Sequence, residues 1–440
     1  AARALPTSLE EMAQFGWTEL DFLLITGDAY VDHPTFGSAL IGRVLWSAGY
    51  KIGIIAQPDW RDLKSFAVLG RPKLAVLISA GNLDSMISNY TASGKPRRED
   101  DFSPSSIGGK RPDRATIVYS NKIREVFKGI PIILGGIEAS LRRFAHYDYW
   151  SDSVRRSILV DSKADALVFG MGEFPILEVA HRLNSGVFDF SHIRGVCYLA
   201  DKLQDNMKLL PSYEEVSSSK IAYNSSFKQT YLEQQSNSQK VMAQKHGDRF
   251  VVYNPPSASL TVEQMDWIYA IPFTRKAHLK YSPDGIKALE EVEFSITSHR
   301  GCFGNCSFCA LSAHQGSIIQ RRSVESVVAE ARLLIGLQNF KGYIHDVGGP
   351  TANFHIPACD KQQNAGQCSG KSCLSPKACA KLQVGHQKYL AMLREVRALP
   401  GVKKVFIRSG IRYDYVILDK DQSFINELCQ HHISGQLKIA

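Results

Sequence analysis

Three cysteines lie close together in the second half of the chain: Cys302, Cys306 and Cys309, in the stretch RGCFGNCSFCALSAHQ. The spacing Cys-x3-Cys-x2-Cys puts three thiolates on one tight loop, and three thiolates can hold three irons of a cubic 4Fe–4S cluster. Because the loop offers no fourth thiolate, the fourth iron would stay open for a small ligand, and an open metal position makes a reactive site. Gly301 and Gly304 suit such a loop, since glycine adopts backbone angles that other residues avoid.

A zinc site and three unrelated buried cysteines are the alternatives for this loop. Structural zinc takes four close ligands, commonly supplied as two pairs, and the loop supplies one trio. Spacing and loop context together therefore favour the cluster. Phe308 directly precedes the third cysteine, where its ring is placed to shield the cluster from water.

Four more cysteines follow in a segment rich in Gly, Lys and Gln: Cys359, Cys368, Cys373 and Cys379. This segment has little apolar surface to bury, so a bound metal is one way to hold it together. Zinc and an auxiliary iron–sulfur cluster both fit four thiolates, and free thiols are the remaining interpretation. The clustering of the chain's cysteines indicates metal binding rather than a disulfide framework, and it predicts a reducing, cytoplasmic compartment.

The elements around the cysteine loop alternate between strand and helix. Phe294 and Ile296 alternate with polar residues as in a short strand, and Ser323 begins an amphipathic helical pattern. Further strands and one helix are expected at 342–347, 387–398 (helix), 404–408 and 436–440. This rhythm predicts a TIM-like (β/α)6 barrel. Since about four barrel strands are visible, we expect the barrel to be truncated, with the rest beyond residue 440.

The first half of the chain repeats a continuous apolar run followed by a small or polar residue, at 21–26, 51–56, 74–79, 130–134 and 166–169. Helical patterns separate most of these runs, which predicts a doubly wound parallel sheet in an α/β fold. Ligands of such sheets lie beyond the carboxyl ends of the strands. The residues expected along that rim are Asp28, Gln57, Ser79, Gly135, Gly136, Glu138, Gly172 and Glu173.

Composition divides the chain into three expected parts: a Rossmann-like N-terminal domain at 1–200, a polar linker and bridging segment at 201–291, and a core domain at 292–440. Hydrophobic residues make up 44% and charged residues 22%, which is ordinary for a globular protein. No apolar run approaches the roughly 18 residues of a membrane span. The net charge of +9 permits an RNA or other anionic partner but does not require one.

The segment 141–156, LRRFAHYDYWSDSVRR, interleaves arginine with aromatic residues. Such a mixture can stack bases or hold an anionic substrate. The favoured alternative is a helix packed between domains, with its aromatic residues inward and its arginines outward, because aromatic side chains more often pack than bind bases.

The cysteine motif resembles the signature of radical S-adenosylmethionine (SAM) enzymes, and almost the whole chain resembles YgiQ-type radical SAM proteins. The resemblance is carried by TGDAYVDHPTFG, IGIIAQPDWR, PDRATIVYSNKIRE, GGIEASLRRFAHYDYWSD, RGCFGNCSFCALSAHQG, DVGGPTAN and SGIRYD. It implies that Cys302, Cys306 and Cys309 ligate the cluster, whose open iron binds SAM for reductive cleavage to a 5′-deoxyadenosyl radical. The substrate stays unassigned. By position, the resemblance also implies SAM contacts at Gly348, Gly349, Arg408 and Ser409, with Pro350 where the family motif has Glu.

Further cofactors and partners follow from the same resemblance. The N-terminal half has the architecture of cobalamin-binding modules, but Asp32 and His33 are adjacent where the motif Asp-x-His-x-x-Gly separates them, which argues against a histidine-ligated cobalamin. A radical SAM enzyme also needs an electron donor such as flavodoxin or ferredoxin. The alternative function is a non-catalytic zinc or iron–sulfur module that binds RNA through its basic and aromatic segments.

Overall fold

The computed structural model describes residues 2–234, 238–368, 370–433 and 435–439, which fold as two compact units. The first unit contains the described residues of 1–234, 238–257 and 272–289, and the second contains those of 258–271 and 290–440. Within the described ranges, no helix is both long and apolar enough to cross a bilayer. Each unit has a hydrophobic core of its own.

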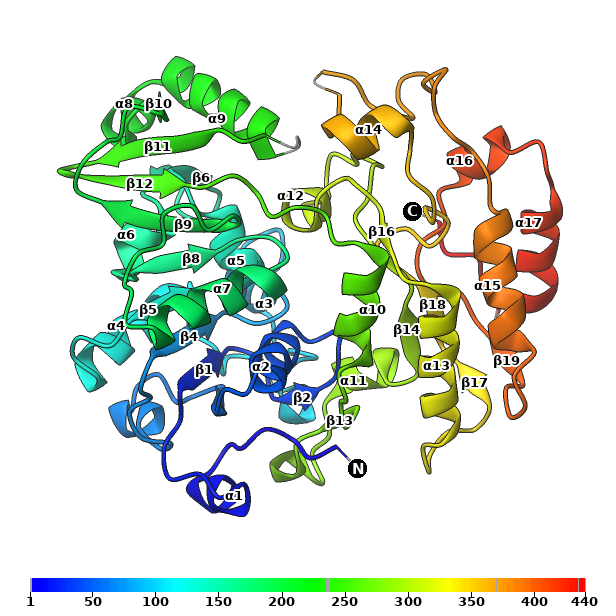
Figure 1. Ribbon diagram of the computed structural model, residues 1–440, viewed down its shortest axis with the longest axis horizontal. Helices are drawn as coiled ribbons and strands as arrows, with labels where there is room; N and C mark the ends of the chain where they lie inside the picture. Colours follow the sequence, from blue (N-terminus) through cyan, green and yellow to red (C-terminus); the bar gives the residue numbers. More distant parts are fainter. Residues whose placement is uncertain (1, 235–237, 369, 434, 440) are drawn as a thin grey trace. The chain divides into compact units, whose positions relative to one another are not determined.

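The first unit is built on a nine-stranded sheet, and the strands from β8 (Ala166–Val168) to the edge strand β3 (Ile52–Ala56) are parallel (Figure 1). These five parallel strands run in the order β3, β1 (Phe22–Thr26), β4 (Ala75–Ser79), β5 (Ile132–Leu134) and β8. Successive side chains on a strand point to opposite faces. Ile54 contacts α2 (Gly37–Ser47), whereas Ile55 joins the core cluster that contains α4 (Ala115–Val126). Helices therefore cover both faces, and the predicted doubly wound α/β sheet is confirmed.

Further helices complete the first unit. They are α1 (Leu9–Gln14), α3 (Ser85–Asn89), α5 (Gly136–Leu141), α6 (Ile158–Ser162), α7 (Glu173–Asn184), α8 (Tyr213–Ser218) and α9 (Lys220–Gln234). Of these, α7 packs on α2 and α6 packs on α4. A pair of short strands, β2 (Val31–Asp32) and β13 (Lys276–Ala277), joins the segment at 272–289 to the start of the chain.

The sheet continues through the segment that the sequence predicted to be a polar linker. After β8 come β9 (Val196–Ala200), β12 (Arg249–Tyr253), β11 (Val241–His246) and β10 (Met207–Leu210). Although the segment is polar overall, β11 and β12 each place alternate apolar side chains in the core, among them Met242, Val251 and Tyr253. The boundary expected at residue 200 therefore differs from the structure, in which the first unit runs on through residue 257.

The strand order β3-β1-β4-β5-β8 has its topological switch point between β1 and β4, where such sheets bind ligands. The loops after these two strands are in close contact here: a Cβ on Gly81 would collide with the carboxylate of Asp28. Arg111 lies beside them, fully buried, with ion pairs to Asp28 at 2.9 Å and to Asp100 at 2.7 Å. The chain's own side chains thus fill the switch point.

Other rim residues also bind the chain itself. Glu138 accepts hydrogen bonds from the backbone N–H groups of Ser85 (2.7 Å) and Thr116 (3.1 Å). The Gln57 side-chain amide donates to the Ser103 hydroxyl at 2.7 Å. These polar side chains therefore tie loops to strand ends.

The arginine-rich and aromatic segment at 141–156 is a hairpin of β6 (His146–Asp148) and β7 (Ser153–Arg155) rather than the expected helix. Its side chains follow the expected orientation only in part, since Phe144 is in the core and Arg156 is exposed. Arg142 forms a largely buried ion pair with Asp84, while Tyr147 and Tyr149 are exposed. The prediction failed because ion pairing lets an arginine enter the interior.

The second unit alternates helices with short parallel strand pairs. β14 (Ser295–Thr297) pairs with β18 (Asp346–Gly348), and β17 (Tyr343–Ile344) pairs with β19 (Lys404–Val405). Both pairs are parallel, as expected for β/α barrel units. The connecting helices are α13 (Val324–Ile335) and α15 (Gln387–Arg397), whose apolar faces share one core, and α10 (Val262–Ala270) packs on α13. Short helices follow at α16 (Tyr413–Leu418) and α17 (Ser423–Glu427).

Candidate metal centre

The cysteine loop connects β15 (His299–Arg300) to α12 (Leu311–Gln315). Gly301 has φ +84, and a Cβ there would collide with the carbonyl oxygen of Ile318. Gly304 is needed for a different reason: a Cβ would lie 2.7 Å from the Arg412 guanidinium and 3.3 Å from Cys302 Sγ. Both glycines therefore belong to the geometry of the loop, one through backbone angle and one through close approach.

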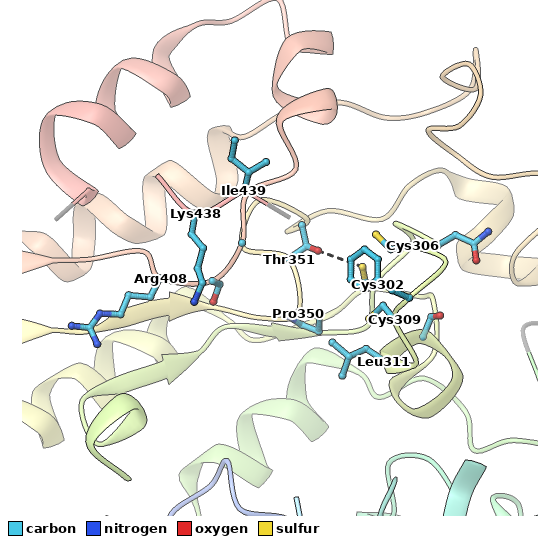
Figure 2. A pocket seen from close by; sticks show the side chains of 14 residues that line it. Cys302, Cys306, Cys309, Leu311, Pro350, Thr351, Arg408, Lys438 and Ile439 are labelled. Carbon is cyan, nitrogen blue, oxygen red and sulfur yellow. Dashed lines mark hydrogen bonds between the residues drawn. The ribbon is translucent and has the colours of Figure 1, made fainter. Parts of the chain in front are cut away.

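The three cysteines of the loop line one pocket of about 340 Å³ (Figure 2). All three are partly buried. In Figure 2, Cys302, Cys306 and Cys309 lie together on one side, and Arg408 and Lys438 lie on the other. The rest of the lining is Asn305, Phe308, Leu311, Ser312, Pro350, Thr351, Ser409, Gly410 and Ile439.

Two of the three sulfurs, those of Cys302 and Cys306, have polar neighbours. Cys302 Sγ lies 3.4 Å from Thr351 Oγ1 and accepts from the Gly304 N–H at 3.4 Å. Cys306 Sγ accepts from an Arg412 N–H at 3.4 Å. Burial raises the pKa of the Cys302 thiol, whereas its hydrogen bonds lower it. Donors aimed at sulfur stabilise thiolates, the form in which cysteine binds metal.

Zinc and a 4Fe–4S cluster place different demands on the three thiols. Among the residues that the structure describes, no three His, Cys, Asp or Glu side chains converge closely enough to hold one metal ion. Zinc needs its thiolates about 2.3 Å from one point, whereas each thiolate of a 4Fe–4S cluster binds a different iron. Three partly buried thiols on one pocket wall are a donor set that fits a cluster with one open iron.

Asp346 in β18 organises the opposite wall. Its carboxylate accepts from the backbone N–H groups of Arg408 (2.8 Å) and Ser409 (3.1 Å), and also from the Ser409 hydroxyl. Burial raises the pKa of Asp346, against the effect of these hydrogen bonds. The Arg408 side chain is left exposed, 3.3 Å from Glu291. Asp346 thereby fixes the backbone on which Arg408 and Ser409 meet the pocket.

Buried His299 joins the strand before the cysteine loop to the loop after β18. Its Nε2 lies 3.0 Å from the carbonyl oxygen of Thr351, and since a carbonyl only accepts, Nε2 carries the proton. Burial lowers the pKa of His299 to about 4, so the ring is neutral at neutral pH. Thr351 is thus held both at its carbonyl and beside Cys302.

A family model described as Radical SAM N-terminal matches residues 4–295. Curated relatives named UPF0313 protein match almost the entire chain. One from Clostridium botulinum (strain ATCC 19397 / Type A) is 54% identical over 442 residues, covering 99% of this chain and 68% of the relative. One from Clostridium perfringens (strain 13 / Type A) is 54% identical over 443 residues, covering 99% and 67%. The chain belongs to the radical SAM family.

Two solved structures of the radical SAM methyltransferase TsrM from Kitasatospora setae are also similar. One, with tryptophan substrate and a SAM analogue bound, matches with a TM-score of 0.43 and 16% identity, covering 76% of this chain and 49% of that one. The other, with cobalamin and a [4Fe-4S] cluster bound, matches with a TM-score of 0.40 and 15% identity, covering 76% and 47%. Similarity at this level assigns neither activity nor ligand to this radical SAM protein.

The site residues expected from the sequence meet the pocket in part. Arg408 and Ser409 line it, and so does Phe308, whose ring is 88% exposed. Gly348 and Gly349 lie just before the lining residues Pro350 and Thr351, and the Gly348 carbonyl accepts from the Ser298 N–H at 2.7 Å. Whether these residues contact SAM stays a prediction.

Four residues in or beside the pocket were not singled out from the sequence: Asp346, Thr351, Arg412 and Lys438. Thr351 and Arg412 stand in the family-like segments DVGGPTAN and SGIRYD, which is the signal that pointed to them. Lys438 carried no signal, because its place on the pocket wall depends on how the end of the described chain folds back.

Proposed function

We propose that Cys302, Cys306 and Cys309 hold three irons of a 4Fe–4S cluster and that SAM binds in the adjoining pocket. The observation that carries the proposal is the presence of all three partly buried thiols on one side of a single pocket. Its volume of about 340 Å³ lies in the range of small-molecule sites, roughly 300–1,000 Å³. Membership of the radical SAM family supports the same cofactor pair.

SAM is an amino acid joined to a nucleoside, and the pocket offers groups that suit both parts. Lys438 supplies a cation for a carboxylate, and Arg408 would supply a second by exchanging its partner Glu291; charged pairs of this kind make strong hydrogen bonds. Leu311, Pro350 and Ile439 supply apolar wall against which an adenine ring can exclude water. The Ser409 hydroxyl already donates a hydrogen bond to Asp346, so toward SAM it would serve as an acceptor.

When bound, the reduced cluster would supply the electron that splits SAM into methionine and a 5′-deoxyadenosyl radical. The protein's part is to position SAM against the open iron and to exclude water. Hydrogen abstraction by such a radical needs no general acid or base. The electron would come from a low-potential protein such as flavodoxin or ferredoxin, and the substrate is unassigned.

The proposal is tested by SAM cleavage with anaerobically reconstituted protein. With dithionite and SAM, the wild-type chain should release 5′-deoxyadenosine, and Cys306→Ala should lower the yield to background because one iron loses its ligand. Cys429→Ala is the matched control, since Cys429 is an exposed cysteine outside both thiol groups. Cleavage by Cys306→Ala at the wild-type rate would refute the proposal.

A further inference from the structure

The second group of cysteines lies in the long connection between β18 and α15. Among the described residues of this connection, the only helix is α14 (Asp360–Ala365). Long connections without regular structure are uncommon in compact domains unless they carry a function. The thiols of Cys359, Cys368, Cys373 and Cys379 are all free, and none lines the pocket of the first group.

Hydrogen bonds fold this connection so that its cysteines approach one another. The Cys379 N–H donates to the Cys373 carbonyl at 2.9 Å. The Gln383 N–H donates to the Ala358 carbonyl at 2.8 Å, which brings the chain after Cys379 beside Cys359. The backbone thus places Cys379 beside Cys373 and carries the end of the segment back toward Cys359.

Apolar packing covers only one side of the segment. Cys373, Leu374, Leu382 and Val384 pack against a small cluster that contains Phe303, Phe354 and Tyr415. The other side is exposed and carries four lysines against one aspartate: Lys361, Lys371, Lys377 and Lys381, with Asp360. Ordering so much exposed chain is costly in entropy. A metal centre that ties the four thiols together would offset that cost, and the lysines would balance the negative charge of bound thiolates.

We propose that Cys359, Cys368, Cys373 and Cys379 hold a second iron–sulfur cluster, one thiolate on each iron of a 4Fe–4S cube. A cluster is favoured over zinc because Cys373 packs against the same apolar cluster as Cys302 of the first group, and the test below separates the two metals. With four thiolates this cluster has no open iron, so it would not bind SAM. It would serve electron transfer or the folding of the connection.

The two thiol groups flank the same apolar cluster. Cys302 of the first group and Cys373 of the second both pack against it. Phe303 and Phe354 stack at its centre, with ring centroids 3.8 Å apart. A second metal centre here would therefore be separated from the first by a few side chains of dry protein, a setting suited to electron exchange between them.

The test uses the chain with the first site removed, Cys302→Ser/Cys306→Ser/Cys309→Ser, reconstituted anaerobically with iron and sulfide. It should retain about four iron and four acid-labile sulfide per chain while releasing no 5′-deoxyadenosine. Adding Cys368→Ser and Cys373→Ser should remove that iron, and adding Cys429→Ser instead should leave it. Less than one iron per triple variant, or one zinc without sulfide, would overturn the proposal.

Two further measurements guard against a variant that fails to fold. In the otherwise wild-type chain, Cys373→Ser should lower iron from about eight to about four per chain, and an unchanged iron content would overturn the proposal.

Because trypsin cleaves after lysine, the four exposed lysines allow its cleavage pattern to report whether the segment is folded. The reconstituted protein should resist cleavage between 361 and 381, chelation should expose these sites, and equal cleavage of both forms would count against the cluster. Failure of SAM cleavage alone leaves each of these results unchanged.

Discussion

Arg412 is the residue through which the protein can most directly influence the first thiol group. Its guanidinium lies 3.4 Å from Cys306 Sγ and 3.2 Å from the Gly304 carbonyl oxygen, and it pairs with Asp414 at 2.5 Å. It is nearly buried, so solvent screens its charge only in part. Hydrogen bonds and charges around cluster sulfurs are among the factors that set the reduction potential of iron–sulfur proteins.

At the scale of this residue, we expect Arg412→Gln to lower the midpoint potential of the first cluster. Reduction adds negative charge, which a nearby cation stabilises, and a unit charge about 5 Å away is worth roughly 3 kcal/mol at an effective dielectric constant of 20. Asp414 offsets part of this, so we expect a fall on the order of tens of millivolts. The measurement is a redox titration without SAM, followed by electron paramagnetic resonance.

Asp414→Asn serves as the matched variant for this effect. Removing the carboxylate leaves the guanidinium less neutralised, so the midpoint should move in the opposite direction, to higher potential. Equal midpoints for wild type, Arg412→Gln and Asp414→Asn would show that the pair has only a structural role.

At the scale of one element, the loop at 90–114 is attached to the sheet by one buried side chain. Most of its residues are exposed. Arg111 nevertheless reaches the end of β1, and both of its carboxylate partners are buried with it. Burial raises the pKa of Asp28 to about 6, against the opposing effect of Arg111. The loop is therefore fixed to the sheet by one guanidinium.

We predict that Arg111→Met lowers the free energy of unfolding of the first unit by about 3–5 kcal/mol, because it leaves two buried carboxylates without their cation. Arg98→Met, an exposed position in the same loop, should change it by less than about 0.5 kcal/mol. Urea unfolding followed by circular dichroism compares the two variants. Similar small effects would mean that water, not Arg111, solvates Asp28 and Asp100.

At the scale of the whole molecule, the chain leaves the first unit after residue 257 and comes back to it at 272–289. The returning segment places β13 beside β2. The Thr274 N–H donates to the Asp32 carboxylate at 2.9 Å, and the Tyr281 hydroxyl accepts from the Tyr30 N–H at 3.0 Å. Asp32 also pairs with buried Arg43. Residues 272–289, which follow a segment of the second unit, therefore complete the first unit.

A set of three fragments tests this organisation. Fragment 1–289 should be more stable to urea than fragment 1–257 by about 2–4 kcal/mol, from several buried hydrogen bonds of roughly 1 kcal/mol each. Fragment 1–271 is the control, since its added residues belong to the second unit, and it should resemble fragment 1–257. Equal midpoints for fragments 1–289 and 1–271 would contradict the assignment of 272–289 to the first unit.

Local pattern was sufficient for the parallel strands and for the cysteine loop. Apolar runs such as 21–26, bounded by small or polar residues, indicated buried parallel strands, and the spacing of Cys302, Cys306 and Cys309 placed three thiols on one loop. Strand signals were weaker at 207–253, because polar residues there share an edge of the sheet with a few core side chains. The sequence therefore predicted a linker where the structure has β10, β11 and β12.

Contacts between groups that lie far apart in the chain depended on tertiary structure. Arg412 reaches Cys306, Asp346 holds Ser409, and Arg111 fills the switch point of the sheet only because folding brings these segments together. Charge and hydrogen bonding act over a few ångströms of space, whereas a sequence reports distance along the chain. The three thiols proposed as metal ligands were thus found from local spacing, and the polar groups that surround them were decided by the packing of strand ends.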